Sequence, residues 1–452
     1  KHKVAADAVD GAAQVINAGL NVRTNFSLPE NFIYPLRHAI SEGKISMQTI
    51  DSRVADVLRV KFMMGLFDNP YKGDTKKLEK VVHCKEHQNV SMRAALESIV
   101  LLKNENNILP LSKSIKKVAV IGPNAAEVDN LICRYGPANA PIKTVYQGIK
   151  DYLPDSEVRY AKGADIIDEY FPESELYDVP LNKTEETMID EAVALAKESD
   201  VAIMVLGGNE KTVREEYSRT NLDLCGRQEK LLQAVYATGK LVILVMIDGR
   251  AATINWAERY IPGIVHAWFP GEFMGDAIAK VIFGDYNPGG KLAVTFPRSV
   301  GQIPFAFPFK PGSDSKGFVR VTGSLYPFGY GLSYTTFDYS ALKIENPVIG
   351  TQGSVKLSCR VKNTGKIAGD EVVQLYLHDE VSSVTTYVKV LRGFERIHLQ
   401  PGEEKVVDFV LTPQDMGLWN KDNHFIVEPG TFAVMVGSSS QDIRLQGKFE
   451  VK

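Results

Sequence analysis

Residues 201–219 read Val-Ala-Ile-Met-Val-Leu-Gly-Gly-Asn-Glu-Lys-Thr-Val-Arg-Glu-Glu-Tyr-Ser-Arg, an apolar run that gives way to a charged loop. The six apolar residues at its start predict a strand that is buried on both faces, as in a parallel sheet. In such sheets ligands bind just beyond the carboxyl ends of the strands. The loop at that end opens with a glycine pair and holds adjacent acids between two arginines, namely Arg214, Glu215, Glu216 and Arg219. A carboxylate placed there can take part in proton transfer.

The strand pattern recurs between about residues 96 and 300. Further apolar runs predict strands at 118–121, 157–160, 241–247 and 263–267, with helical patterns such as 184–197 and 228–238 between them. Strands that alternate with helices favour an α/β sandwich, in which a mostly parallel sheet is covered on both faces. Three of the strands are followed by turns that we therefore expect at one edge of the sheet: Gly122-Pro123, Gly207-Gly208 and Asp248-Gly249.

The chain before this region has a different character. Residues 1–70 combine helical patterns with a brief strand candidate at 20–22, which is typical of the closing fragment of an α/β domain. Within this segment Ser46 is a plausible cap for a helix that Gly65 ends. A polar, lysine-rich linker is predicted at 71–95.

Two further segments follow the α/β region. Residues 301–335 are rich in proline, glycine and aromatic residues, which predicts an extended linker that packs over other surfaces. Residues 336–452 alternate apolar and polar positions over short runs separated by turn signals. That pattern predicts an all-β sandwich of the immunoglobulin or fibronectin type.

Length and composition exclude several classes of function. A chain of 452 residues predicts two or three domains, and its 44% apolar and 24% charged residues are typical of a globular protein. The net charge of −3 and the lack of a basic run argue against nucleic-acid binding. The longest apolar runs fall short of the roughly 20 residues that span a bilayer. The 4 cysteines lack metal-ligand spacing and favour buried thiols over a disulfide framework.

Several residues near the predicted sheet edge could carry chemistry. Acids on loops are usually solvated, but Glu215 and Glu216 follow a buried strand, so one of them could be tuned as a general acid and base. Arg134 and Tyr135, in a loop after the first strand, suit a sugar-binding lip, although a packed structural loop explains them equally well. Asp248 could serve at the same edge or cap the following helix.

Other sites common on parallel sheets find less support. Trp268 could offer an aromatic platform, but packing of the following helix explains it as well. No Gly-x-Gly-x-x-Gly or Walker pattern follows a strand, and residues 122–125 hold too few glycines for a phosphate cradle. A Gly-x-Ser-x-Gly elbow is also absent, which argues against hydrolysis by a serine nucleophile.

With these residues in view, the chain resembles glycoside hydrolase family 3 in its three-domain β-glucosidase form. The motifs that carry the resemblance are Val118-Ala-Val-Ile-Gly-Pro-Asn-Ala125, Trp268-Phe-Pro-Gly-Glu272, Phe283-Gly-Asp-Tyr-Asn-Pro-Gly-Gly-Lys-Leu292, Thr295-Phe-Pro297 and Tyr326-Pro-Phe-Gly-Tyr-Gly-Leu-Ser-Tyr334. The resemblance covers nearly the whole chain. It implies the C-terminal part of a TIM-barrel-like domain at 1–70, an α/β sandwich with the acid/base loop at 96–300, and a fibronectin type III-like domain at 336–452.

The family implies a retaining mechanism with an Asp nucleophile from the barrel and a Glu acid/base from the α/β domain. Its acid/base pattern, such as Glu-Gly-Tyr-Asp-Arg, falls on residues 215–219, which makes Glu215 the acid/base and Glu216 its alternative. The candidate substrate-binding residues are Arg134, Tyr135 and Arg219. The Ser-Asp-Trp or Ser-Asp-Tyr motif of the family's nucleophile does not occur in this chain, so we expect the nucleophile upstream, in a larger protein. This chemistry requires no metal and no organic cofactor.

The leading hypothesis is a β-glucosidase that releases terminal glucose from oligosaccharides or glucosides. A β-xylosidase or a dual enzyme is the alternative within the family, and a non-catalytic carbohydrate-binding subunit is the alternative from another class. The expected partners are the sugar substrate, the upstream barrel portion and a second copy in a homodimer, with no nucleic acid and no membrane span. Relatives are often periplasmic or secreted, so the resemblance implies such a location.

Overall fold

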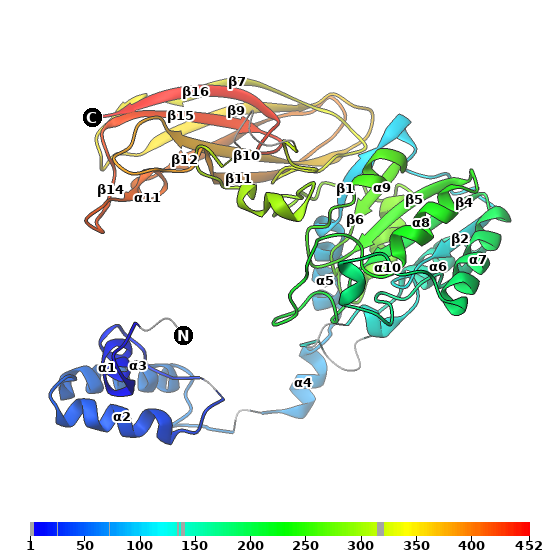
Figure 1. Cartoon of the computed structure of the whole chain (residues 1–452). Coiled ribbons are helices and arrows are strands. Elements are labelled where there is room, and N and C mark those ends of the chain that lie inside the picture. The colour runs from blue at the N-terminus through cyan, green and yellow to red at the C-terminus, as the bar shows by residue number, and fades with distance from the viewer. Residues whose placement is uncertain (1–3, 25, 72, 133–134, 137–140, 314–320) are drawn as a thin grey trace. The chain divides into compact units, whose positions relative to one another are not determined.

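The computed structural model describes residues 4–452 except 25, 72, 133–134, 137–140 and 314–320 (Figure 1). The chain divides into two compact units, residues 1–85 and 86–452. The second unit takes in the end of the linker predicted at 71–95, because α5 (Lys85–Ser98) packs into the core of the following sheet through Ala95.

Helices form the regular structure of the first unit: α1 (Ala8–Asn17), α2 (Glu30–Ser41), α3 (Met47–Met63) and α4 (Thr75–Val81). Ser46 caps α3 as predicted, since its hydroxyl accepts a hydrogen bond from the Thr49 amide, and Gly65 follows the helix with a φ of 64°. The strand expected at 20–22 is wrong: its backbone is irregular, and none of the described residues of this unit forms a strand with which it could pair.

A six-stranded sheet in the order β1-β6-β5-β4-β2-β3 organises the first part of the second unit. Its strands are β1 (Val100–Asn104), β2 (Lys117–Ile121), β3 (Glu157–Ala161), β4 (Val201–Gly207), β5 (Leu241–Ile247) and β6 (Gly263–His266). All neighbours pair in parallel except β1 and β6, which are antiparallel. The prediction of a mostly parallel α/β sheet is therefore confirmed, although the edge strand β1 was not predicted.

Helices cover both faces of the sheet, and β4 is buried along its whole length between them (Figure 1). One face packs against α6 (Val145–Tyr152) and α10 (Met274–Ile282), and β4 contributes to it Val201, Ile203 and Val205. The other face packs against α7 (Lys183–Lys197), α8 (Gln228–Tyr236) and α9 (Asn255–Tyr260), and β4 contributes to it Ala202, Met204 and Leu206. Alternate residues of one strand thus fill two cores.

The chain leaves the neighbouring strands β2 and β4 toward opposite faces of the sheet. The connection after β2 runs through η2 (Val128–Asn130) into α6 on one face, whereas β4 leads into α8 on the other. The carboxyl ends of β2 and β4 therefore form a topological switch point, the place where open α/β sheets bind their ligands. The acidic loop begins at this switch point.

Residues after 336 form the predicted β-sandwich. One sheet has the order β11-β10-β15-β16-β8 and the other β12-β9-β7. The strands are β7 (Phe337–Glu345), β8 (Val348–Ile349), β9 (Val355–Asn363), β10 (Gly369–Asp379), β11 (Val390–Leu399), β12 (Glu404–Leu411), β15 (Gly430–Gly437) and β16 (Ile443–Val451). A short helix, α11 (Pro413–Met416), and the hairpin of β13 (Leu418–Trp419) and β14 (Phe425–Ile426) follow β12.

The described parts of the 301–335 segment pack against both the α/β part and the sandwich, as predicted. Tyr326 pairs with Phe296 in an antiparallel bridge and is 5% exposed, so the segment completes the core of the α/β part. On the sandwich side, the Gln374 side chain donates a hydrogen bond to the Gly329 carbonyl at 3.0 Å. These contacts hold the sandwich against the α/β layers within the second unit.

Asp248 is a buried acid at the carboxyl edge of the sheet. It follows β5 and is 6% exposed, and its Oδ1 accepts a hydrogen bond from the Arg250 amide at 3.0 Å. It closes a local turn and does not cap α9, whose first residues have no side-chain cap. Burial raises the pKa of this carboxyl to about 6, although the hydrogen bond from Arg250 and the charges of Arg219 and Arg250 oppose the shift.

This pKa predicts a pH-dependent cost to stability. The folded protein holds the Asp248 proton more tightly than the unfolded chain does, so ionisation lowers the free energy of unfolding as the pH rises from about 4 to about 6. Asp248→Asn removes the ionisation and keeps an oxygen for the Arg250 amide. We expect the free energy of unfolding of the variant, relative to the wild type, to rise by roughly 2–3 kcal/mol over that pH range.

Chemical denaturation at pH 4, 5, 6 and 7 checks this expectation. Asp155→Asn, which removes an exposed acid from the same domain, is the matched control. A difference between Asp248→Asn and the wild type that stays flat or falls with pH would contradict the buried, proton-holding carboxyl.

Candidate active site

Two glycines let the chain turn sharply out of β4. Gly207 has a φ of 143°, and a Cβ there would lie 2.0 Å from the Ile247 carbonyl oxygen at the end of β5. A Cβ on Gly208 would lie 2.7 Å from the Thr212 hydroxyl and 3.0 Å from Asp248 Oδ1. The glycine pair is therefore required by the close approach of two strand ends and the loop folded over them.

Buried amide side chains fix the first residues of the loop. Gln228, fully buried at the start of α8, accepts a hydrogen bond from the Gly207 amide and donates one to the Gly207 carbonyl, each 2.8 Å long. Asn124, which follows β2, donates to the carbonyls of Gly208 at 2.9 Å and of Ile247 at 3.1 Å. The ends of β2, β4 and β5 are thereby joined, and the loop starts from a rigid base.

The same base is linked to the loop after β2. Asn209 Nδ2 donates a hydrogen bond to Asn130 Oδ1 at 2.8 Å, and the Asn209 backbone and side chain close a turn with Lys211 and Thr212. The two loops that flank the switch point are therefore in contact. This is the arrangement in which residues from both can face one ligand.

Glu215 and Glu216 occupy the tip of the loop, in a turn that runs from Arg214 to Tyr217. The Tyr217 amide donates to the Arg214 carbonyl at 3.4 Å, and the Arg214 guanidinium lies 3.8 Å from the centre of the Tyr217 ring. Glu216 has a left-handed backbone with a φ of 71°, which is uncommon for a residue with a Cβ. Both glutamates are exposed, so the tip presents two carboxyl groups to whatever faces it.

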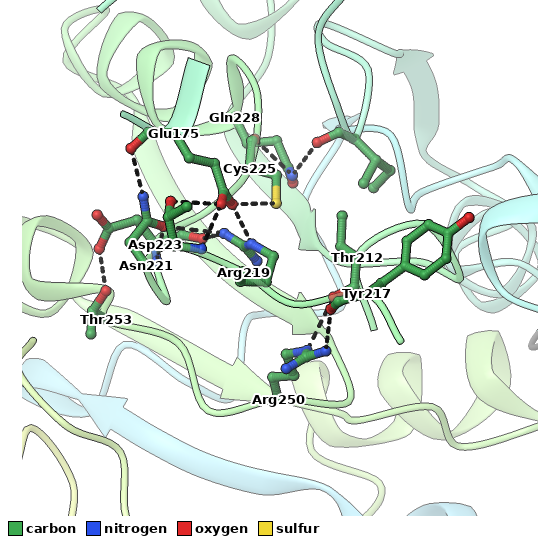
Figure 2. Close-up of polar contacts among 12 residues, drawn as sticks. Glu175, Thr212, Tyr217, Arg219, Asn221, Asp223, Cys225, Gln228, Arg250 and Thr253 are labelled. Atoms are coloured by element: carbon green, nitrogen blue, oxygen red, sulfur yellow. Dashed lines mark hydrogen bonds and ion pairs between the residues drawn. The ribbon is translucent and has the colours of Figure 1, made fainter. Parts of the chain in front are cut away.

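Arg219, a predicted substrate-binding residue, bonds to other residues of the protein (Figure 2). Its side chain is 6% exposed and forms an ion pair with the Glu175 carboxylate, which is 4% exposed. Arg219 Nη2 also donates to the Asp223 carbonyl at 2.7 Å and to Asn221 Oδ1 at 3.2 Å. This placement does not favour direct substrate binding, because the guanidinium is occupied by the protein itself.

The Glu175 carboxylate gathers several donors from the end of the acidic loop. Besides Arg219, the amide and hydroxyl of Thr220 donate to it at 2.9 and 2.8 Å. Burial alone would raise the pKa of Glu175, but the bonds from Thr220 and the charge of Arg219 outweigh burial and hold that pKa below its usual value. Glu175 is therefore a charged anchor.

Arg250 reaches the loop from the other side (Figure 2). Its Nε donates to the Thr212 carbonyl at 3.0 Å and its Nη2 to the Tyr217 carbonyl at 3.1 Å. Neither Glu175 nor Arg250 is a functional candidate on the sequence pattern alone. Glu175 belongs to the short 3₁₀ turn η3 (Glu173–Glu175), outside any periodic segment, so its pattern carries no signal; Arg250 could have been noted because it follows a strand at the same edge as β4.

The remaining predicted residues have mixed outcomes. Arg134 lies outside the described residues. Tyr135 is 80% exposed, five positions beyond the Asn130 that contacts the loop base, so substrate binding by this ring stays a prediction. Trp268 has a left-handed backbone with a φ of 57° and packs edge-on against the buried His266, 4.2 Å between ring centres. This contact belongs to the core on the face of the sheet opposite α10, so the ring is packed, but not against the helix that follows it.

Three other kinds of feature bear on function in the described part of the chain: metal-binding groups, cysteine thiols and membrane-spanning helices. There, no group of three or more His, Cys, Asp or Glu side chains is arranged to hold a metal ion. Cys225 and Cys359 are buried free thiols, as predicted, whereas Cys84 is only partly buried. Within the same part of the chain, no helix combines the length and the apolar character that crossing a bilayer demands.

Comparison with known proteins assigns the chain to a family. Residues 99–334 match the glycosyl hydrolase family 3 C-terminal domain, and residues 371–440 match a fibronectin type III-like domain. A β-xylosidase of Formosa agariphila is 39% identical over 97% of this chain, and a periplasmic β-glucosidase of Salmonella typhimurium is 38% identical over all of it. The chain spans 61% of the length of each of these relatives.

Solved structures agree with this assignment. A β-glucosidase from Erythrobacter marinus matches all of this chain with a TM-score of 0.87 and 35% identity, and one from Listeria innocua, in complex with glucose, does so with a TM-score of 0.84 and 29% identity. This chain covers 61% of each. With an α/β domain that carries an acidic loop at its switch point, a fibronectin-like sandwich behind it and a family model matched from residue 99 to 334, the chain belongs to glycoside hydrolase family 3.

Proposed function

We propose that this chain supplies the acid/base half of a retaining β-glucosidase that removes terminal, non-reducing β-D-glucosyl residues from oligosaccharides. The observation that carries the proposal is the exposed Glu215, held at the tip of a loop whose base is pinned at the switch point of the sheet. Membership of the family supports the reaction class, and the position of this carboxyl supports its proposed role as acid/base.

The reaction needs two carboxyl groups on opposite sides of the glycosidic bond, roughly 5 to 5.5 Å apart for retention of configuration. In the proposed mechanism an Asp of the upstream barrel portion attacks the anomeric carbon while Glu215 gives its proton to the leaving oxygen. Glu215 then takes a proton from the water that hydrolyses the glycosyl-enzyme, which restores both carboxyl groups. The barrel portion is thus a required partner of this chain.

The backbone of the turn supports Glu215 over Glu216. In the family pattern the acid/base residue is followed by a small residue or glycine, and Glu216 occupies the left-handed position that glycine adopts without strain. A side chain there is tolerated, but the turn does not depend on it. Glu215 therefore has the residue-specific role, and Glu216 is replaceable.

A β-xylosidase is the second candidate, because the Formosa agariphila relative is a β-xylosidase at 39% identity. Glucose and xylose differ by one hydroxymethyl group, which a barrel pocket can accept or exclude without any change in the acidic loop. A periplasmic or secreted location is proposed by analogy with the Salmonella typhimurium relative.

Glu215→Ala, made in the full-length protein with its upstream portion, should separate substrates by their leaving groups. Turnover of cellobiose should fall roughly 10²- to 10⁴-fold, because its alkoxide leaving group needs a proton donor. Dinitrophenyl β-glucoside should still form the glycosyl-enzyme, because its leaving group needs no proton. Azide should then restore turnover by attacking that intermediate. Initial rates with and without azide measure both effects; equal rates for variant and wild type on cellobiose would show that Glu215 is the wrong residue.

Glu216→Gly should leave the activity within a few-fold of the wild type. Glycine adopts a φ of 71° without a steric penalty, so the turn and the position of its neighbour are kept, and the free energy of unfolding should change by less than about 1 kcal/mol. The same cellobiose and dinitrophenyl glucoside assays check this. If Glu216→Gly shows the leaving-group selectivity and Glu215→Ala does not, the two roles are exchanged.

Paired 4-nitrophenyl β-glucoside and β-xyloside should distinguish the two candidate substrates. We expect a higher kcat/KM for the glucoside in the full-length protein. A preference for the xyloside by tenfold or more, about 1.4 kcal/mol of transition-state binding, would assign the protein to the xylosidases instead.

A further inference from the structure

We propose that Arg250 and Glu175 form a two-point clamp that fixes the acidic loop, residues 213–219, and so act as positioning residues for the acid/base carboxyl. The inference rests on the proposed function for the role of Glu215. It adds two residues that no motif marks, one on each side of the loop (Figure 2).

The first point of the clamp is Arg250. Arg250 donates two bonds, to the carbonyls of Thr212 and Tyr217, and these two residues lie on either side of the tip in the chain. Its own backbone is held because its amide donates to the buried Asp248. A guanidinium is planar and presents several N–H donors in a fixed fork, so one side chain can bond two carbonyls at once; the single flexible ammonium of a lysine does not reproduce that geometry.

The second point is Glu175, which holds the far end of the loop. Its buried carboxylate accepts bonds from Arg219 and from the amide and hydroxyl of Thr220. The Glu175 carbonyl also accepts a bond from Asn221 Nδ2 at 3.2 Å. Because both members of the ion pair are nearly inaccessible to water, loss of one charge leaves the other buried without its counter-charge. These bonds therefore hold the end of the loop in one position.

The tip between these points needs such support. Glu215 and Glu216 are exposed, and the left-handed backbone of Glu216 persists only where its surroundings over-determine it. Local contacts across the tip include the weak 3.4 Å bond from the Tyr217 amide to the Arg214 carbonyl, the ring of Tyr217 under the Arg214 guanidinium, and the 3.1 Å ion pair of Arg214 with Glu210. A displacement of about 1 Å in a proton donor costs on the order of 100-fold in rate, so the position of the tip has direct consequences for proton transfer.

Three variants of the full-length protein test the clamp: Arg250→Ala, Arg250→Lys and Glu175→Gln. Matched controls are Arg259→Ala, on the exposed face of α9, and Glu173→Gln, an exposed acid two positions from Glu175 in the same short turn. The readout is kcat/KM over a series of aryl and alkyl β-glucosides of increasing leaving-group pKa. A residue that only stabilises the fold lowers all these values in the same proportion.

We expect a selective loss in the clamp variants. Arg250→Ala and Glu175→Gln should lower kcat/KM roughly 10- to 100-fold for alkyl glucosides and only a few-fold for dinitrophenyl glucoside, because the former depend on a correctly placed proton donor. Arg250→Lys should recover little, and added guanidinium at tens of millimolar should partly restore Arg250→Ala. The two controls should behave as the wild type.

Hydrogen exchange provides a readout that needs no activity. Arg250→Ala should speed amide exchange at 213–217, and Glu175→Gln at 219–221, with exchange in β4 and β5 unchanged. Equal losses over all leaving groups, or unchanged exchange in the loop, would overturn the clamp. If Glu215→Ala itself shows no leaving-group dependence, the acid/base assignment fails instead, so the two failures are distinguishable.

Discussion

The structure depends on the burial of β4 between two helical layers and two neighbouring strands. A strand with apolar side chains on both faces can pack only in the middle of a covered parallel sheet, and this places its carboxyl end at the switch point beside β2. The backbone of β4 then approaches β5 so closely that only glycine fits at 207. Every contact of the acidic loop starts from this fixed strand end, so the position of the site follows from the packing of the sheet.

The strand and the start of the acidic loop can be predicted because each depends on residues that lie close together in the chain. The run 201–206 predicts a buried strand, the glycine pair predicts a turn, and adjacent acids predict proton chemistry, each from residues close in the chain. The strands of the parallel sheet and the sandwich follow from the same kind of pattern. The edge strand β1 was missed because it pairs antiparallel with β6 at the margin of an α/β repeat, where the alternation of strands with helices gives no expectation.

The contacts that hold the loop could not be predicted in the same way. Glu175 and Arg219 are 44 positions apart, and the irregular segment that carries Glu175 has neither a helical nor a strand period. The sequence makes Arg219 a candidate for substrate binding, yet a charged side chain at the end of the acidic loop serves equally well as an anchor. Only the burial of both partners distinguishes the two roles.

The acidic loop has a firmly bonded base and an exposed tip. The loop is held at its base by the side-chain amides of Gln228 and Asn124, and along its length by Glu175 and Arg250. Its tip carries exposed carboxyl groups that no described residue encloses. Proton donation by a carboxyl near neutral pH calls for a low-dielectric setting or a second carboxylate nearby. In the proposed function, the nucleophile carboxylate of the upstream barrel portion is this second carboxylate. If the proposed clamp holds the tip in one position, little conformational entropy is lost when the two carboxyl groups are brought together around the substrate.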